Sequence, residues 1–179
     1  MIRHLACTAL ILAAGCSRDA DQNDTANAVN EAPAGASLKK ADGTDAGMVT
    51  QSEDANGVTV KIEVAGLEPG AHGLHLHTVG RCDGPKFESA GPHWNPTGKQ
   101  HGRDNPQGAH LGDLANLDVG TDGRGSATFL VSGTTLKGAT NPLIDLDGAA
   151  LVVHAKADDY KTDPSGSSGD RIACAILEG

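Results

Sequence analysis

The chain has 179 residues, a length that suits one domain with a tail. Its formal net charge of −9, without a cluster of lysines and arginines, argues against a nucleic-acid-binding protein, because such proteins neutralise phosphates with basic residues. Two Phe, one Tyr and one Trp against 24 Gly and 8 Pro favour a core of small aliphatic side chains and many short strands.

The N-terminal sequence MIRHLACTALILAAGC has the features of an export signal. Arg3 is basic and residues 5–14 are mostly apolar, but this run is too short to cross a membrane as a stable helix. The ending AAGC resembles a bacterial lipobox, so we expect residues 1–15 to be a signal peptide and Cys16 to be acylated. An ordinary secretory signal that is removed together with Cys16 is the alternative.

Residues 16–35 are polar and rich in alanine, which predicts a disordered tether in front of a domain formed by residues 36–179. The signal predicts a periplasmic protein of a Gram-negative bacterium, attached to the membrane only through the lipid on Cys16. In that oxidising compartment we expect Cys82 and Cys174, the cysteines that remain for the domain, to form a disulfide.

Short β-like runs alternate with turn signals from residue 36 onward. The run VTVKIEV at 58–64 alternates apolar and polar residues, which predicts a strand with one buried side, and ANG at 55–57 predicts a hairpin before it. Further strands are predicted at 36–41, 46–53, 126–132, 149–157 and 171–177. Seven or eight strands of this length favour an all-β sandwich or flattened barrel.

Two long segments, residues 79–108 and 155–170, are rich in Gly, Pro and charge and do not fit as strands. Loops of this length are uncommon inside a compact domain and are usually functional. Both segments carry or border histidines, so we expect them to be functional loops.

Seven histidines follow the signal, all between residues 72 and 154. In the stretch GAHGLHLH at 70–77, His75 and His77 share one face of a strand because side chains alternate, so both imidazoles converge on one metal. His72 has the opposite parity and is predicted to form hydrogen bonds away from that metal. A lone histidine is usually a surface or core residue, but this pattern, with five more histidines, favours a metal site.

The sequence AHLGDL places Asp113 three residues after His110. Three imidazole nitrogens and one carboxylate oxygen form a closed tetrahedral set suited to zinc, whereas a site of imidazoles alone suits copper. The residues therefore permit two metals, but their number leaves open how the ligands divide.

Six motifs together resemble the copper–zinc superoxide dismutases in order and approximate spacing. They are GAHGLHLH (70–77), SAGPHWNP (89–96), HG (101–102), AHLGDL (109–114), LVVHAKADD (151–159) and GDRIACAI (169–176). The resemblance covers residues 36–179. It implies a Greek-key β-sandwich or flattened barrel of about eight antiparallel strands, one copper and one zinc per subunit, and the conversion of superoxide to dioxygen and hydrogen peroxide.

The resemblance also implies a division of the ligands. Copper falls on His75, His77, His93 and His154, and zinc falls on His93, His101, His110 and Asp113. His93 therefore bridges the two metals and delivers a proton to the second superoxide, which makes it a catalytic residue. Asp158 matches the carboxylate that links a copper-side histidine to a zinc-side histidine, and Cys82 with Cys174 matches the disulfide of the family.

An acidic protein needs local positive charge to attract an anionic substrate, because salt screens charges beyond about 8–10 Å. Arg171 matches the arginine at the mouth of the copper site and is the second implied catalytic residue. Lys86, in the first long loop, is a candidate for steering superoxide, and an ordinary solvated loop lysine is the alternative for it.

Two other functions are compatible with parts of the sequence. A periplasmic copper-binding or copper-delivery module on the same scaffold would keep the ligands without turnover. A surface adhesion domain would leave the histidines unexplained and would expose aromatic anchors, which this chain lacks. The sequence leaves open whether the chain forms a homodimer.

Overall fold

The computed structural model of the chain describes residues 35–178, and these carry nine strands and one short 3-10 helix at Glu88–Ala90. The predicted signal peptide, the acylated Cys16 and the tether up to residue 34 lie outside the described residues. Within residues 35–178, no helix is long and apolar enough to cross a membrane.

The predicted runs form strands close to their expected bounds. They are β1 (Gly35–Lys40), β2 (Asp45–Asp54), β3 (Gly57–Ala65), β7 (Arg124–Ser132), β8 (Ala149–His154) and β9 (Arg171–Leu177). The stretch GAHGLHLH forms β4 (Gly70–His72) and β5 (Leu74–His77), and β6 (Leu117–Val119) is a further short strand that the sequence did not predict. The count of nine strands slightly exceeds the expected eight.

The strand at 149–157 was predicted three residues too long, since β8 ends at His154. The reason lies in the backbone hydrogen bonds that follow. Ala155 N and Lys156 N donate to Asp170 O and Ser168 O of the second long loop, at 2.8 and 2.9 Å, instead of continuing the sheet.

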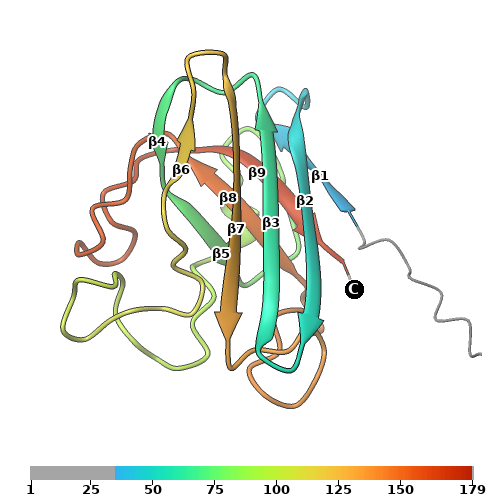
Figure 1. The fold of residues 1–179 in the computed structure, drawn as a ribbon, viewed down its shortest axis with the longest axis vertical. Coiled ribbons are helices and arrows are strands. Elements are labelled where there is room, and N and C mark those ends of the chain that lie inside the picture. The colour runs from blue at the N-terminus through green and yellow to red at the C-terminus, as the bar shows by residue number, and fades with distance from the viewer. Residues whose placement is uncertain (1–34, 179) are drawn as a thin grey trace, which may run out of the picture. The chain divides into compact units, whose positions relative to one another are not determined.

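Seven strands form one antiparallel sheet in the order β5-β8-β9-β1-β2-β3-β7, and β4 pairs with β6 in a small second sheet. The large sheet curls so that β2, β3 and β7 form one layer and β5, β8 and β9 the other (Figure 1). Since β4 leads into β5 and β6 leads into β7, the small sheet lies between the two edges of the large one. The architecture is therefore the predicted all-β flattened barrel.

The core between the layers consists mainly of aliphatic side chains, as the composition indicated. In β3, Val58, Val60 and Ile62 are fully buried, whereas Lys61 and Glu63 are exposed, which confirms the predicted alternation. This periodicity of two fixes the register of the strand, because a slip by one residue would expose the buried side chains.

A second, smaller apolar cluster attaches the first long loop to the outside of the barrel. Phe87 and Ala90 of this loop pack against Ala150 and Val152 of β8. The predicted disulfide between Cys82 and Cys174 is present, with the Cα atoms 5.7 Å apart. Together these contacts fix the loop against β8 and β9, on the same side of the barrel as the second long loop (Figure 1).

Candidate metal centre

The pairing of β5 with β8 positions three histidines on the outside of the barrel. His75 and His77 of β5 lie opposite Val152 and Ala150 of β8, and His154 ends β8. All three imidazoles are buried, because the two long loops cover this face. The strand parity is therefore as the sequence predicted, with alternate residues of β5 in the barrel core.

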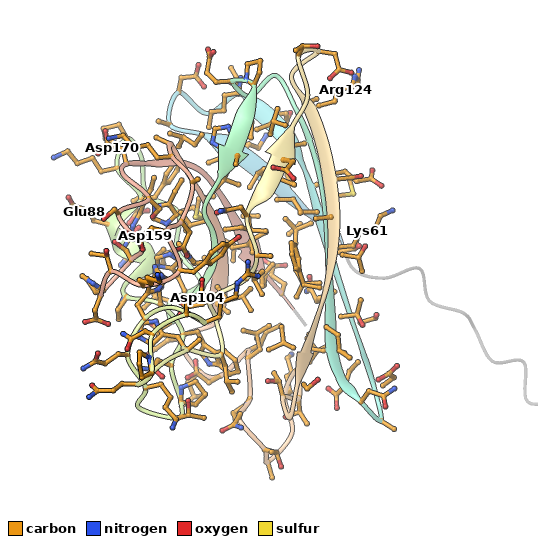
Figure 2. All side chains as sticks on the ribbon, turned by 60° about the vertical axis from the view of Figure 1, so that its left-hand side comes forward. Lys61, Glu88, Asp104, Arg124, Asp159 and Asp170 are labelled. Carbon is orange, nitrogen blue, oxygen red and sulfur yellow. A yellow bond between two sulfur atoms is a disulfide. The ribbon has the colours of Figure 1, made fainter. Side chains whose placement is uncertain are left out.

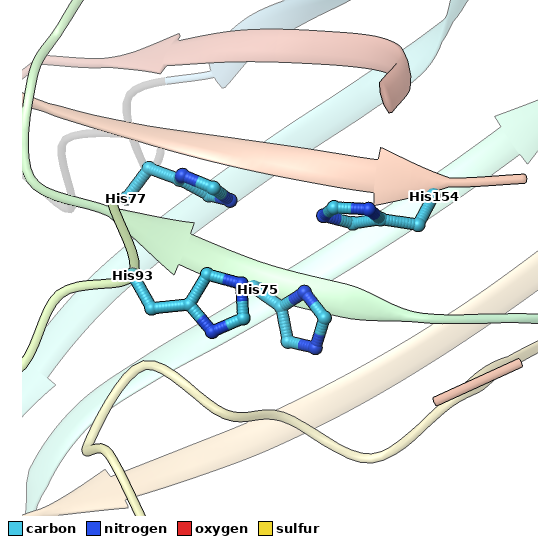
Figure 3. A group of neighbouring side chains, drawn as sticks. All are labelled: His75, His77, His93 and His154. Atoms are coloured by element: carbon cyan, nitrogen blue, oxygen red, sulfur yellow. The ribbon is translucent and has the colours of Figure 1, made fainter. Parts of the chain in front are cut away.

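His93 reaches the same place from the first long loop. A backbone bridge joins it to His77, and the next residue, Trp94, donates from its N to Leu76 O at 2.7 Å. The loop thus follows β5 as an additional backbone segment. His75, His77, His93 and His154 form the group that we call the four-histidine group (Figure 3). One ring nitrogen from each lies within 4.8 Å of the others.

Each ring from β5 and β8 is held through one nitrogen and leaves the other without a partner. His77 Nδ1 donates to Gly91 O at 2.9 Å, and His154 Nδ1 donates to Gly169 O at 3.1 Å. These bonds fix the proton on Nδ1 and leave the lone pair on Nε2. His75 has the opposite arrangement, with Nε2 on a carboxylate and Nδ1 unpartnered.

Unpartnered buried ring nitrogens are costly unless something binds them. Among the described residues, six buried side-chain polar atoms lack a hydrogen-bond partner. Three of them are ring nitrogens of the four-histidine group, on His75, His77 and His154, and a fourth, His101 Nδ1, lies 3.0 Å from the Asp113 carboxylate. Neutral imidazoles with converging lone pairs suit copper, so the four-histidine group fits this metal.

A second group forms around the carboxylate of Asp113. Asp113 Oδ1 lies 2.9 Å from His93 Nδ1 and 3.0 Å from both His101 Nδ1 and His110 Nδ1. We call these four residues the Asp113 group. Their donor set of three imidazole nitrogens and one carboxylate oxygen fits zinc. His75 also offers a donor atom within 4.8 Å of those of His93, His101 and Asp113.

Backbone contacts orient the Asp113 carboxylate. Asp113 Oδ2 accepts hydrogen bonds from Gly102 N at 2.9 Å and from His110 N at 3.0 Å. The preceding Gly112 lies so close to β5 that a Cβ there would stand 2.6 Å from Leu76 O. In the sequence LGD, the glycine therefore allows the loop to approach the strand closely, and the next residue supplies the carboxylate.

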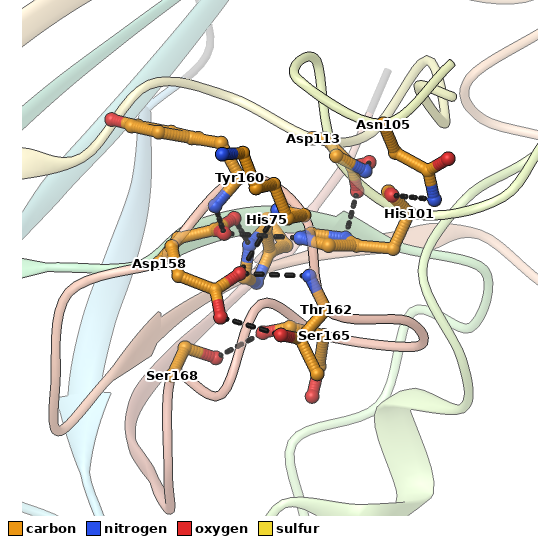
Figure 4. Close-up of polar contacts among 12 residues, drawn as sticks. His75, His101, Asn105, Asp113, Asp158, Tyr160, Thr162, Ser165 and Ser168 are labelled. Carbon is orange, nitrogen blue, oxygen red and sulfur yellow. Dashed lines mark hydrogen bonds and ion pairs between the residues drawn. The ribbon is translucent and has the colours of Figure 1, made fainter. Parts of the chain in front are cut away.

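Asp158 joins the two groups. Its Oδ2 accepts a hydrogen bond from His75 Nε2 at 2.8 Å, and its Oδ1 accepts one from His101 Nε2 at 3.0 Å (Figure 4). The carboxylate is almost fully buried. The second long loop thus brings Asp158 between a histidine of each group, which fixes the orientation of both rings.

The rings of the four-histidine group are poor bases. Burial lowers the pKa of His77 to about 2, and the neighbouring His93 adds to this effect. Burial likewise lowers the pKa of His154 to about 3 and that of His93 to about 4. The pKa of His75 is also lowered, because burial outweighs the hydrogen bond to Asp158. At neutral pH these rings are therefore unprotonated, which is the form that binds a metal.

Charge dominates around Asp113 and Asp158. Burial acts to lower the pKa of His101, but its contacts with the two carboxylates outweigh burial and raise this pKa to about 9. Burial acts to raise the pKa of each carboxyl, but the hydrogen bonds from His101 and its neighbours hold both well below their usual range. A divalent cation among these donors would take the place of the His101 proton.

Arg171 is connected to the four-histidine group. It donates from Nη1 to Phe87 O at 2.7 Å and from Nη2 to Gly91 O at 2.8 Å. Gly91 O also accepts the hydrogen bond from His77 Nδ1. The side chain borders a hollow of about 970 Å³, and among the other residues that line it are His93, His110, His154 and Lys99.

Two further predicted residues lie nearby. His72 is buried, and its Nδ1 and Nε2 lie 2.7 Å from His154 O and 2.8 Å from Glu68 O. Its ring therefore contacts backbone carbonyls and belongs to neither donor group. Lys86 does not line the hollow next to His93 but a neighbouring one of about 790 Å³ that also contains Arg171. Lys99, which lines the hollow next to His93, was not among the predicted site residues.

Acidic side chains lie on the surface of the long loops, among basic ones such as Lys86 and Lys99. Glu88, Asp159 and Asp170 lie on the side of the loops, whereas Lys61 and Arg124 lie on the far side of the barrel (Figure 2). A small anion that approaches the hollow therefore depends on the positive charge at the hollow itself.

Comparisons with known proteins agree with this architecture. The family model for copper/zinc superoxide dismutase (SODC) matches residues 46–177. The superoxide dismutase-like protein YojM of Bacillus subtilis is 45% identical over 131 residues, which cover 72% of this chain and 67% of YojM. The Cu-Zn superoxide dismutase of Caulobacter vibrioides is 42% identical over 144 residues, which cover 79% of this chain and 83% of that protein.

The crystal structure of a SOD-like protein from Bacillus subtilis matches with a TM-score of 0.76 and 41% identity, over 80% of this chain and 97% of that chain. The fold and the two donor groups define a metal-binding β-barrel protein. With the family model and the curated relatives, the chain belongs to the copper/zinc superoxide dismutase family. The histidine clusters of the site are compatible with the binding of copper and zinc.

Proposed function

We propose that the chain is a superoxide dismutase. One superoxide loses an electron and becomes dioxygen, and a second gains that electron with two protons and becomes hydrogen peroxide. The observation that carries the proposal is the four-histidine group, whose ring nitrogens converge, three of them without a hydrogen-bond partner, next to Arg171 at the edge of a hollow. A metal bound there is within reach of a small anion.

The proposed division of ligands follows the donor atoms. Copper would be held by His75, His77, His93 and His154, and zinc would be held by His93, His101, His110 and Asp113. The unpartnered nitrogens support the first set, and the contacts of 3.0 Å or less around Asp113 Oδ1 support the second. We propose one copper and one zinc per chain.

Bound copper supplies the one-electron chemistry, which zinc cannot provide. The remaining steps belong to the chain itself. The Arg171 guanidinium, held in place by two loop carbonyls, attracts and orients the superoxide anion. His93 keeps Nδ1 towards Asp113 and has Nε2 to hold a proton, which it donates to the peroxide as it forms. The burial of the rings keeps water away from them.

A copper-binding module without turnover is the alternative, and the relative YojM is named only as a superoxide dismutase-like protein, so activity has to be measured directly. Metal content by elemental analysis, measured beside the rate of superoxide removal with and without a copper chelator, separates the two. We expect one copper and one zinc per chain and a rate that the chelator abolishes. Full copper occupancy without turnover would instead establish the binding module.

We further propose that the protein is periplasmic and is tethered to a membrane through a lipid on Cys16. The signal-like sequence up to Cys16 supports this proposal. Labelled palmitate supplied to expressing cells tests it, because Cys16→Ser should lose the label and move the protein to the soluble fraction. If the unsubstituted chain carries no label, an ordinary cleaved signal explains the sequence. Sedimentation of the released domain then distinguishes a monomer from a homodimer.

A further inference from the structure

Tyr160 lies where the two long loops meet. Its N donates to Asp158 Oδ1 at 2.6 Å, and its O accepts a hydrogen bond from Asp104 N at 3.0 Å, three residues after His101. The backbone of Tyr160 has φ 61°, a left-handed conformation that is rare for an aromatic residue. It follows that one residue contacts both the loop that carries Asp158 and the loop that carries His101 (Figure 4).

The hydroxyl of Tyr160 reaches a third segment. Asn116 N, three residues after Asp113, donates to Tyr160 Oη at 2.9 Å. The amide of Asn116 in turn holds the backbone of Asp158, since Oδ1 accepts from Asp158 N at 2.8 Å and Nδ2 donates to Asp158 O at 3.0 Å. Tyr160 and Asn116 therefore fix Asp158 through its carboxylate and through both of its backbone polar atoms.

The ring of Tyr160 is covered by Arg103, whose guanidinium carbon lies 3.7 Å from the ring centroid. At this distance a guanidinium attracts the aromatic face. Arg103 is two residues after His101, so the contact ties the ring to the first long loop at the residues next to a proposed zinc ligand. The backbones also meet here, because a Cβ on Gly102 would lie 2.1 Å from Tyr160 O.

We infer that Tyr160, held by Arg103 and Asn116, is a positioning residue that couples the proposed zinc site to the proposed copper site through Asp158. The inference rests on the proposed metal sites. Asp158 accepts hydrogen bonds from one histidine of each group, so a displacement of its carboxylate changes the orientation of both rings. Partners of this kind set the basicity and direction of metal ligands.

The coupling predicts an order of effects among variants. Tyr160→Phe keeps the ring under Arg103 and removes only the acceptor for Asn116 N, so zinc affinity should fall by about three-fold to ten-fold. Tyr160→Leu removes the ring as well and should weaken zinc affinity by about 10-fold to 100-fold, the range for the loss of an outer hydrogen-bond partner. Arg103→Gln should weaken zinc affinity by an amount between those of the two Tyr160 variants. Lys161→Gln, at the exposed next residue, is the matched control and should change nothing.

The test uses the full domain with cobalt(II) as the probe of the zinc site and copper(II) as the probe of the other site. Competitive titration gives the affinity, the visible spectrum of cobalt reports the geometry of its ligands, and electron paramagnetic resonance of copper reports His75. We expect the variants that weaken cobalt binding to shift the copper spectrum too. A structural role alone would lower the melting temperature and leave both spectra and affinities at the values of the control.

Tyr160→Phe keeps the test valid if the leucine variant fails to fold. Unchanged cobalt affinity in a folded Tyr160→Phe and in Arg103→Gln would overturn the inference. These readouts need no turnover. If the protein proves to be a copper-binding module without dismutase activity, the coupling still stands or falls on the two spectra, so failure of the proposed function and failure of this inference are distinguishable.

Discussion

The two donor groups share His93 but are built from different kinds of structure. In the four-histidine group, His75, His77 and His154 belong to paired strands, and the sheet ladder fixes their backbone before any metal binds. In the Asp113 group, the other ligands lie outside the strands and are fixed by hydrogen bonds between loop segments and to the Asp113 carboxylate. We call the loops that carry the Asp113 group the loop side, and the strands that carry His75, His77 and His154 the strand side. A change on the loop side should therefore alter metal affinity and stability first. A change on the strand side should alter catalysis first.

The same contrast appears in the electrostatics. On the strand side burial dominates and keeps the rings neutral, as the lowered pKa values of His77 and His154 show. On the loop side two carboxylates dominate and raise the pKa of His101. The strand side therefore offers lone pairs to a redox metal, whereas the loop side offers negative charge that needs a cation. Asp158 and His93 are the connections between the two.

The largest effect is expected from matched ligand deletions. His77→Ala removes a proposed copper ligand on a strand and should lower the dismutase rate by at least about 100-fold, beyond the usual loss for an outer partner of a ligand. His110→Ala removes a proposed zinc ligand in a loop and should lower zinc affinity strongly while a measurable dismutase rate remains. Metal content and superoxide removal, measured on both variants, test the contrast.

His72→Gln is the control for these deletions, because this histidine is buried nearby but contacts only backbone oxygens. It should keep both metals. The contrast between the groups fails if His110→Ala loses copper and activity as completely as His77→Ala does.

The disulfide joins a loop to a strand, so its removal sharpens the comparison. Cys82 and Cys174 are separated by 92 residues, and on the chain-entropy model such a bridge contributes about 4.6 kcal/mol to the free energy of unfolding. Replacing both cysteines with serine should remove most of this stabilisation. Urea unfolding of the metal-free protein measures it, and reduction of the unsubstituted protein is the parallel experiment. Equal urea midpoints for oxidised and reduced protein would contradict the prediction.

The pH dependence of the metal-free protein should have two separate limbs. In the four-histidine group, His77, His154 and His93 have folded-state pKa values of about 2, 3 and 4, below the value of 6.5 for an unfolded chain. The unfolded state then binds more protons, so stability falls as the pH drops below about 6.5. On the loop side, the pKa of His101 is raised to about 9, so its contribution is complete below pH 6.5 and is lost as the pH rises to about 9.

Urea midpoints between pH 4 and pH 10 measure both limbs. His101→Gln should remove the alkaline limb and leave the part of the acid limb that comes from His77, His154 and His93, which assigns the alkaline limb to His101. If the alkaline limb persists in this variant, the raised pKa of His101 is not its cause.

Much of the strand side could be predicted from the sequence. Strict alternation in residues 58–64 identified β3, and the parity of His75 and His77 followed from their spacing. Two short strands were missed or only partly seen, β4 and β6, because three residues are too few to show a period. The end of β8 was misplaced because backbone hydrogen bonds to a distant loop terminate it, and no local residue signals them.

On the loop side, residue chemistry alone indicated His110 and Asp113 as donors suited to zinc, and the rest could be read only through the resemblance to a family. The spacings between His93, His101 and His110 have no period, so composition and pattern could not place them around one carboxylate. Asn116 and Tyr160 were missed altogether. Their contacts go to backbone atoms of distant segments, and such contacts leave no motif in a single sequence.

The smallest effect concerns the attraction of superoxide, where the loops set the charge around a centre carried by strands. Lys86 was predicted to steer the anion, and the structure suggests Lys99 as a comparison, because it lines the same hollow as His93 and Arg171. Neutralising either lysine with glutamine should lower the rate at low salt by about two-fold to three-fold, with no change at high salt, where screening removes the attraction. Since Lys86 lines the neighbouring hollow, we expect its effect to be smaller than that of Lys99. If only Lys86→Gln keeps the salt dependence of the unsubstituted protein, Lys99 is the lysine that steers the substrate. If both variants keep it, Arg171 is the local charge that attracts the substrate.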